Sequence, residues 1–120
     1  MKVLVTGGSG FLGRHVCEAL RAGHEVIAGL RAYDLTDISR TDAMFRNSGP
    51  FDAVVHCAAL VGGIGLNQAR PADLWRENLL MGINVLDACT RQRVKRLVML
   101  GTTCSYPRTP KTIPFTEAEL

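Results

Sequence analysis

A glycine-rich loop carries the clearest chemical signal in the chain. Gly7, Gly10 and Gly13 follow the spacing G-x-x-G-x-x-G, after an apolar run at residues 3–5 and at the start of a helical pattern. Gly7 suits a sharp turn out of a strand, Gly10 leaves room beside the backbone, and Gly13 allows close helix–sheet packing. Free N–H groups at such a helix start attract phosphate, which favours a dinucleotide site over a turn that binds nothing. The predicted site comprises Gly7, Gly8, Ser9, Gly10, Phe11, Leu12 and Gly13.

The end of the second expected strand bears on the choice of cofactor. Enzymes that use NAD commonly place a carboxylate about 20 residues after the glycine loop, where it binds the ribose 2′-hydroxyl. Here that position falls around Arg31, whose planar cation suits a 2′-phosphate and favours NADP. A surface arginine without a ligand is the alternative. Asp34 could still reach a ribose if the strand extends further, and Asp34 or Asp37 could instead cap a helix.

The composition is that of an ordinary globular α/β domain. Of the 120 residues 47% are hydrophobic and 21% are charged, and the net charge is only +3. The late basic residues are not interleaved with aromatic residues as a nucleic-acid platform would need, so no nucleic-acid partner is expected. No apolar segment is long enough for a bilayer, so no membrane partner is expected either. The four cysteines form no C-x-x-C pair, which argues against a metal site and favours a cytoplasmic location.

Strand and helix patterns alternate along the chain, as in a doubly wound parallel sheet of the Rossmann type. Short apolar runs predict strands, and apolar residues at three- and four-residue steps predict helices. The expected elements are strand 3–5, helix 11–22, strand 25–30, helix 37–47, strand 53–58, helix 71–91 and strand 96–100. Residues 60–67 and the chain beyond residue 101 are expected to be loops. With right-handed crossovers we predict the strand order 3-2-1-4.

These segments together resemble the extended short-chain dehydrogenase/reductase family of nucleotide-sugar epimerases and dehydratases. The match spans the whole chain, and within the family the chain looks most like the GDP-L-fucose synthases. The family match is carried by the glycine loop, by His56-Cys57-Ala58-Ala59, by Pro71 with Asn78, Asn84 and Ala88, and by Gly101-Thr102-Thr103-Cys104-Ser105-Tyr106-Pro107. The subfamily match is carried by Val61-Gly62-Gly63-Ile64 with Asn67 and Pro71-Ala72-Asp73, and by the segment from Leu100 to Pro107.

The resemblance implies roles for residues at the strand ends. Asp34 and Leu35 resemble an acidic pair that lies against adenine, and Ala58 and Ala59 would leave room for the cofactor unless sheet packing alone selects them. By the same resemblance Thr102 would hydrogen-bond the C4 oxygen of the sugar. Cofactor contacts are also expected from Leu100, Gly101 and Thr103.

Cys104 matches the acid/base of C3 and C5 epimerisation in the GDP-L-fucose synthases, where a thiol exchanges a proton with carbon acidified by the neighbouring ketone. A buried structural cysteine is the alternative. The family's serine pair is replaced here by Thr102-Thr103.

The resemblance implies the function of an NADP-dependent epimerase/reductase that acts on a nucleotide sugar. The family's Tyr-x-x-x-Lys pair does not occur in the 120 residues. We therefore expect residues 1–120 to be the N-terminal, cofactor-binding part of a longer enzyme, inactive alone. The alternatives are an NAD-dependent 4-epimerase or 4,6-dehydratase and a non-catalytic NADP-sensing module. The related enzymes dimerise through the long helix, which suggests a homodimer that uses Leu74, Leu79, Ile83 and Leu86.

Overall fold

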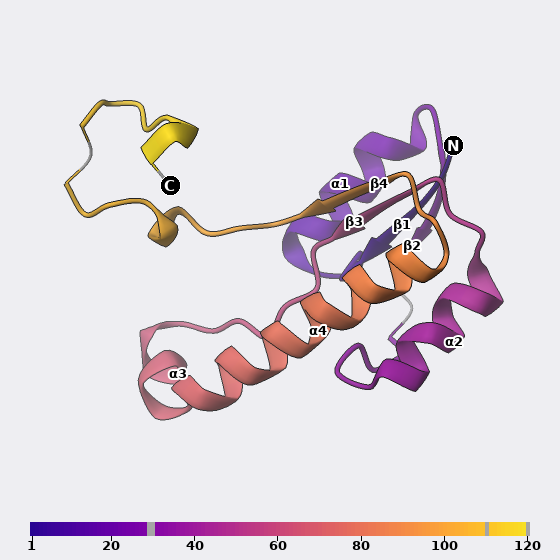
Figure 1. Cartoon of the computed structure of the whole chain (residues 1–120), viewed down its shortest axis with the longest axis horizontal. Coiled ribbons are helices and arrows are strands. Elements are labelled where there is room, and N and C mark those ends of the chain that lie inside the picture. The colour runs from indigo at the N-terminus through magenta and orange to yellow at the C-terminus, as the bar shows by residue number, and fades with distance from the viewer. Residues whose placement is uncertain (29–30, 110, 120) are drawn as a thin grey trace.

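A four-stranded parallel sheet forms the centre of the computed structural model, which describes residues 1–28, 31–109 and 111–119 (Figure 1). Its strands are β1 (Lys2–Thr6), β2 (Glu25–Ala28), β3 (Ala53–His56) and β4 (Arg96–Met99). The parallel α/β fold is confirmed. The strands expected to end at residues 58 and 100 end two residues and one residue earlier, at His56 and Met99. The last two residues of the expected strand 25–30 lie outside the described residues.

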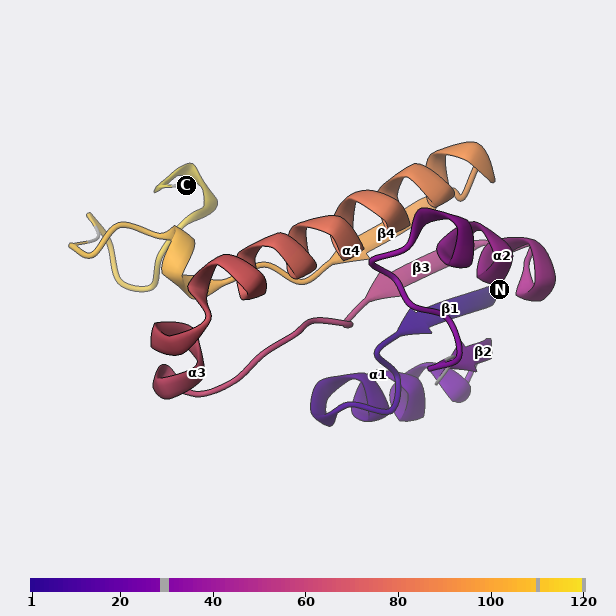
Figure 2. The same cartoon turned by 90° about the horizontal axis from the view of Figure 1, so that it is seen from below.

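The predicted strand order 3-2-1-4 is wrong, because the sheet has the order β2-β1-β3-β4. β1 pairs with β2 on one side, Val3 opposite Val26, and with β3 on the other, Leu4 opposite Val54. The helices explain this order, since α1 (Phe11–Arg21) covers one face and α2 (Ile38–Ser48) covers the other (Figure 2). When the helices change face, a right-handed crossover from β2 has to pass back over β1.

Alternate side chains of β1 pack into two separate cores. Val3 and Val5 face α1 and contact Cys17, whereas Leu4 faces α2 and α4 (Pro71–Arg91). The second core is the larger one, and Phe45 meets Phe51 there edge to face at 5.6 Å. This burial on both faces is why residues 3–5 form a continuous apolar run rather than an alternating one.

Helix ends follow the local signals in the sequence. Asp37 caps α2, where one carboxylate oxygen accepts N–H bonds from Ser39 and Arg40 at 2.7 and 3.1 Å. Pro71 occupies the first turn of α4, and Arg91 in its last turn pairs with Asp42 of α2 at 2.7 Å. None of the helices in the described ranges is long and apolar enough to cross a membrane.

Short helices form in two stretches for which the sequence predicts loops. Residues 60–67 contain the start of α3 (Ile64–Ala69), despite their glycines, because the Asn67 side chain donates to the carbonyls of Gly62 and Gly63 at 3.0 and 3.1 Å. Beyond β4 the chain runs away from the sheet and includes two single-turn 3-10 helices, Thr103–Ser105 and Glu117–Glu119 (Figure 1).

Candidate functional site

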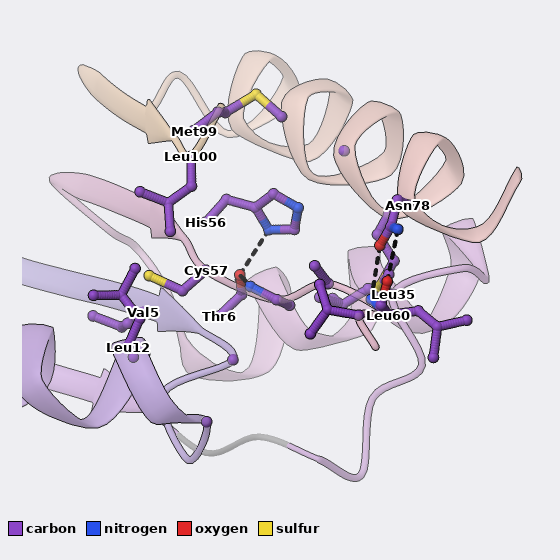
Figure 3. Close-up of a pocket in the computed structure, with 18 of the residues that line it drawn as sticks. Val5, Thr6, Leu12, Leu35, His56, Cys57, Leu60, Asn78, Met99 and Leu100 are labelled. Atoms are coloured by element: carbon purple, nitrogen blue, oxygen red, sulfur yellow. Dashed lines mark hydrogen bonds between the residues drawn. The ribbon is translucent and has the colours of Figure 1, made fainter. Parts of the chain in front are cut away.

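A large open cleft, with a volume of about 1060 Å³, lies at the carboxyl ends of β1, β3 and β4. The glycine loop, the segment after β2 and the start of the chain after β3 form three of its walls, and α4 forms the fourth (Figure 3). In doubly wound sheets this is the side on which ligands bind. Among the residues singled out from the sequence, those that line it are Gly7, Ser9, Gly10, Phe11, Leu12, Gly13, Arg31, Asp34, Leu35, Ala58, Ala59, Leu100 and Gly101.

The glycine loop is held in shape by close backbone packing. Gly7 has a φ of +66°, and a Cβ there would come within 2.6 Å of the Ala58 nitrogen. A Cβ on Gly13 would overlap the Gly7 carbonyl oxygen, and the Gly10 N–H donates to that same oxygen at 2.8 Å. Gly8 lies beneath the loop against Cys17, outside the cleft lining. Glycine is therefore required here by the fold itself, before any ligand is considered.

The start of α1 offers uncompensated donors to the cleft. Gly10 at the N-cap has no side chain to cap the helix, and the first turn holds no acidic residue. The first bond within the helix runs from the Arg14 N–H to the Gly10 carbonyl at 3.1 Å, so the N–H groups of Phe11, Leu12 and Gly13 precede it. A Cβ on Gly10 would meet one described atom within 4 Å, the Gly7 oxygen at 3.1 Å. This open helix end fits a pyrophosphate by donor chemistry and by space.

Arg31 belongs to the segment after β2 and lies beside the glycine loop. Its Nε–H donates to the Ser9 hydroxyl oxygen at 3.0 Å, and both side chains are exposed and line the cleft. The guanidinium therefore stands beside the helix end that would hold the pyrophosphate. Its role toward a 2′-phosphate stays a prediction.

Asp34 and Leu35 form the far wall of the nucleotide end. The Asp34 carboxylate accepts from the Thr36 N–H at 2.9 Å and from the Thr36 hydroxyl at 2.7 Å. These two hydrogen bonds lower the pKa of Asp34. The Leu35 carbonyl accepts from the Asn84 amide of α4 at 2.8 Å, which fixes this wall to the long helix. Asp34 thus holds a turn, and the helix cap predicted for Asp34 or Asp37 falls on Asp37.

The floor of the cleft is a hydrogen-bonded chain that sequence reasoning missed (Figure 3). The Thr6 hydroxyl accepts from the Ala58 N–H at 3.3 Å and lies 2.7 Å from His56 Nδ1. The hydrogen between Thr6 and His56 is carried by the hydroxyl or by Nδ1 according to the imidazole tautomer, since a hydroxyl can accept two hydrogen bonds as well as donate one. Burial lowers the pKa of His56, so the neutral ring is favoured.

The wall nearest α4 is fixed by one amide. Asn78 accepts from the Leu60 N–H at 2.7 Å and donates to the Leu60 carbonyl at 2.8 Å, as a neighbouring strand would (Figure 3). The sequence singles out Asn78 through the family resemblance, but it does not indicate Leu60 as the partner of its amide. Further lining residues that the sequence did not single out for this site are Tyr33, Thr36, Cys57, Val61, Glu77, Met81, Gly82 and Met99.

The predicted chemical residues lie apart from this cleft. Thr102 lines a second, more apolar groove of about 710 Å³ along α4, and its Oγ accepts the Cys104 N–H at 3.1 Å. Cys104 is exposed within the part of the chain that the structure describes. Thr103 begins a 3-10 helix. The roles of all three residues stay predictions.

The remaining cysteines are free thiols within the fold. Cys57 and Cys89 have raised pKa values, that of Cys89 about 11, because burial disfavours their thiolates. Cys17 packs under the glycine loop. Three histidine, cysteine or acidic side chains placed to hold a metal ion do not occur among the described residues.

Comparison with known proteins agrees with this geometry. Residues 3–120 match the family model described as the NAD dependent epimerase/dehydratase family. A GDP-L-fucose synthase from Azorhizobium caulinodans is 38% identical over 108 residues, covering 88% of this chain and 34% of that protein. The chain thus spans about a third of the length of the curated relatives it matches.

Solved structures share the fold over almost the whole chain. A GDP-mannoheptose C4 reductase from Campylobacter jejuni, solved with NADP bound, superposes with a TM-score of 0.86 at 29% identity. It is covered to 38% of its length by 99% of this chain. A Thermus thermophilus UDP-glucose 4-epimerase in complex with NAD gives a TM-score of 0.82 at 33% identity, with 99% and 43% covered. With its glycine turn, open helix end and matching family model, the chain belongs to the NAD-dependent epimerase/dehydratase family.

Proposed function

We propose that residues 1–120 are the cofactor-binding part of an NADP-dependent nucleotide-sugar epimerase/reductase of the GDP-L-fucose synthase type. The observation that carries the choice of NADP is the position of Arg31 at the mouth of the nucleotide end, hydrogen-bonded to Ser9 of the glycine loop. A planar guanidinium binds a phosphate monoester with two parallel hydrogen bonds. The nearest carboxylate in sequence, Asp34, is already engaged by Thr36.

The chain's own groups divide the work between the two ends of the cleft. The N–H groups at the start of α1 bind the pyrophosphate, and the Leu35 wall lies against the adenine. The reduced cofactor, NADPH, would supply the hydride for reduction of a 4-keto sugar. Thr102 donates a hydrogen bond to the C4 oxygen of that sugar. The Cys104 thiol exchanges the protons at C3 and C5, which the 4-keto group makes acidic.

The substrate we propose is a GDP-linked 4-keto-6-deoxy sugar, in line with the relatives named GDP-L-fucose synthase. The proposed location is the cytoplasm, where an exposed thiol such as Cys104 stays reduced. The proposed partner is a second copy, which would cover the apolar side chains of α4. Exposed there are Trp75, Leu79, Ile83 and Leu86, whereas Leu74, which was also predicted for the dimer, is buried and therefore not available to a partner.

Two substitutions in the full-length protein separate cofactor binding from cofactor choice. Arg31→Ala should weaken NADPH binding by about 1.5–3 kcal/mol and leave NADH binding nearly unchanged, as expected for a hydrogen bond to a charged group. Gly10→Val should abolish the binding of both, because its side chain enters the space for the pyrophosphate. Fluorescence titration measures both affinities, and circular dichroism checks the fold.

The outcomes distinguish the competing functions. Equal losses for both cofactors in Arg31→Ala would remove Arg31 from the 2′-phosphate site and favour an NAD-dependent 4-epimerase, a class to which the Thermus neighbour belongs. Normal NADPH binding by Gly10→Val would leave the loop as a turn only. Tight NADPH binding without turnover of any 4-keto sugar would favour a non-catalytic sensing module.

A further inference from the structure

Ser9 has an unusual partner for an exposed serine in a glycine turn. Its hydroxyl oxygen accepts the Nε–H of Arg31 at 3.0 Å, across 22 residues of sequence. Among the described residues, Ser9 is the one hydrogen-bond partner of the Arg31 side chain. Both side chains line the cleft. The contact joins the glycine loop after β1 to the segment after β2.

The contact with Ser9 occupies only one edge of the planar Arg31 guanidinium. Of its five N–H groups, one on Nε is used by Ser9, while the four on the two Nη atoms remain for a ligand. A phosphate monoester bound by the two Nη atoms then receives parallel hydrogen bonds from a planar group whose rotation is already restricted. Free arginine side chains lose much rotamer freedom on binding, so restricting one beforehand favours the bound state.

We propose that Ser9 is a specificity-determining residue that acts through Arg31, holding the guanidinium in position for the 2′-phosphate of NADP. The inference rests on the proposed use of NADP and adds a residue that has no phosphate contact of its own. Ser9 contributes to the discrimination between NADP and NAD, and contributes nothing to the binding of the shared pyrophosphate and nicotinamide.

The test is a double-mutant cycle in the full-length protein, with NADPH and NADH titrated separately. Ser9→Ala should weaken NADPH binding about 3- to 10-fold and leave NADH binding unchanged, a typical effect for one hydrogen bond. Ser9→Thr keeps the hydroxyl and should restore the wild-type ratio of affinities. Ser39→Ala, the same change on the exposed start of α2 outside the cleft, is the matched control and should alter neither affinity.

The decisive arm is Ser9→Ala in the Arg31→Ala background, where the serine substitution should have no further effect on NADPH. A persisting loss there would mean that Ser9 binds the cofactor directly, which overturns the inference. No effect of Ser9→Ala in the wild-type background, beside a selective Arg31→Ala effect, would also overturn it and leave the proposed NADP use intact. Equal losses for NADPH and NADH in Arg31→Ala alone would instead overturn the proposed cofactor and this inference together.

Discussion

The glycine turn and the segment after β4 both follow strands of one sheet, yet the chain packs them very differently. A Cβ on Gly13 would overlap Gly7 and come within 2.7 Å of its carbonyl carbon, whereas a Cβ on Gly101 meets no described atom within 4 Å. Beyond Gly101, Thr102 and Cys104 are exposed, and the Cys104 N–H donates a hydrogen bond to the Thr102 hydroxyl within the same turn. The nucleotide end of the cleft is thus built from contacts inside these 120 residues.

The segment after β4 is held by local contacts instead. Thr102 caps a single turn of 3-10 helix, and the rings of Tyr106 and Phe115 stack with their centroids 5.0 Å apart. The chain after β4 runs away from the sheet (Figure 1). Side chains held by such local contacts are more mobile than side chains packed against the sheet. We therefore expect substitutions in the glycine turn to change the free energy of unfolding, and substitutions at Thr102 and Cys104 to change reaction rates.

The largest expected effect is chemical and lies in the exposed segment. Cys104→Ser in the full-length protein should slow proton exchange at C3 and C5 of the 4-keto sugar by roughly 10²-fold or more, the usual contribution of a general acid/base. Its free energy of unfolding should change by less than about 0.5 kcal/mol, because the side chain is exposed. Solvent-deuterium incorporation followed by NMR measures the exchange.

Thr102→Val is the matched variant for that experiment. It should slow the reduction and spare the exchange, because it removes the proposed hydrogen bond to the C4 oxygen and leaves the thiol. Unchanged exchange in Cys104→Ser would take the thiol out of the reaction and move the chain toward the 4-epimerases and dehydratases.

An intermediate effect, on stability, is expected in the glycine turn. Gly13→Ala should lower the free energy of unfolding by about 1–3 kcal/mol, since the new methyl group overlaps backbone that cannot move away. Gly101→Ala, the matched change at the other end, should shift it by less than about 0.5 kcal/mol. Urea denaturation of both variants gives the difference, and equal losses would show that the two ends are packed alike.

The smallest expected effect concerns His56, which touches both regions. Its side chain bonds Thr6 before the glycine turn, and its carbonyl accepts the Leu100 N–H at 3.4 Å. Burial lowers its pKa in the folded state below the ordinary 6.5, so the unfolded chain binds more protons once the pH drops below 6.5. Stability should therefore fall with pH below 6.5 and level off under the folded-state pKa.

His56→Gln should reduce this pH dependence, which urea denaturation at several pH values between about 8 and 5 detects. The same slope in the wild type and in His56→Gln would mean that other groups, not His56, cause it.

The sequence was sufficient where a signal is local. The glycine spacing predicted the turn into α1, Pro71 predicted the first turn of α4, and Asp37 was recognised as a possible cap. Each of these follows from backbone geometry or a hydrogen bond within a few residues. The apolar run at residues 3–5 likewise predicted a strand buried on both faces.

What only the tertiary structure decided depends on residues far apart in the chain. The strand order depends on which face each helix covers, and periodicity within a helix does not report that face. The contacts Arg31–Ser9, Thr6–His56 and Asn78–Leu60 join segments 18 to 50 residues apart. Residue types alone do not specify such pairs, because the sheet register and the helix position bring the partners within hydrogen-bond distance only after the chain has folded.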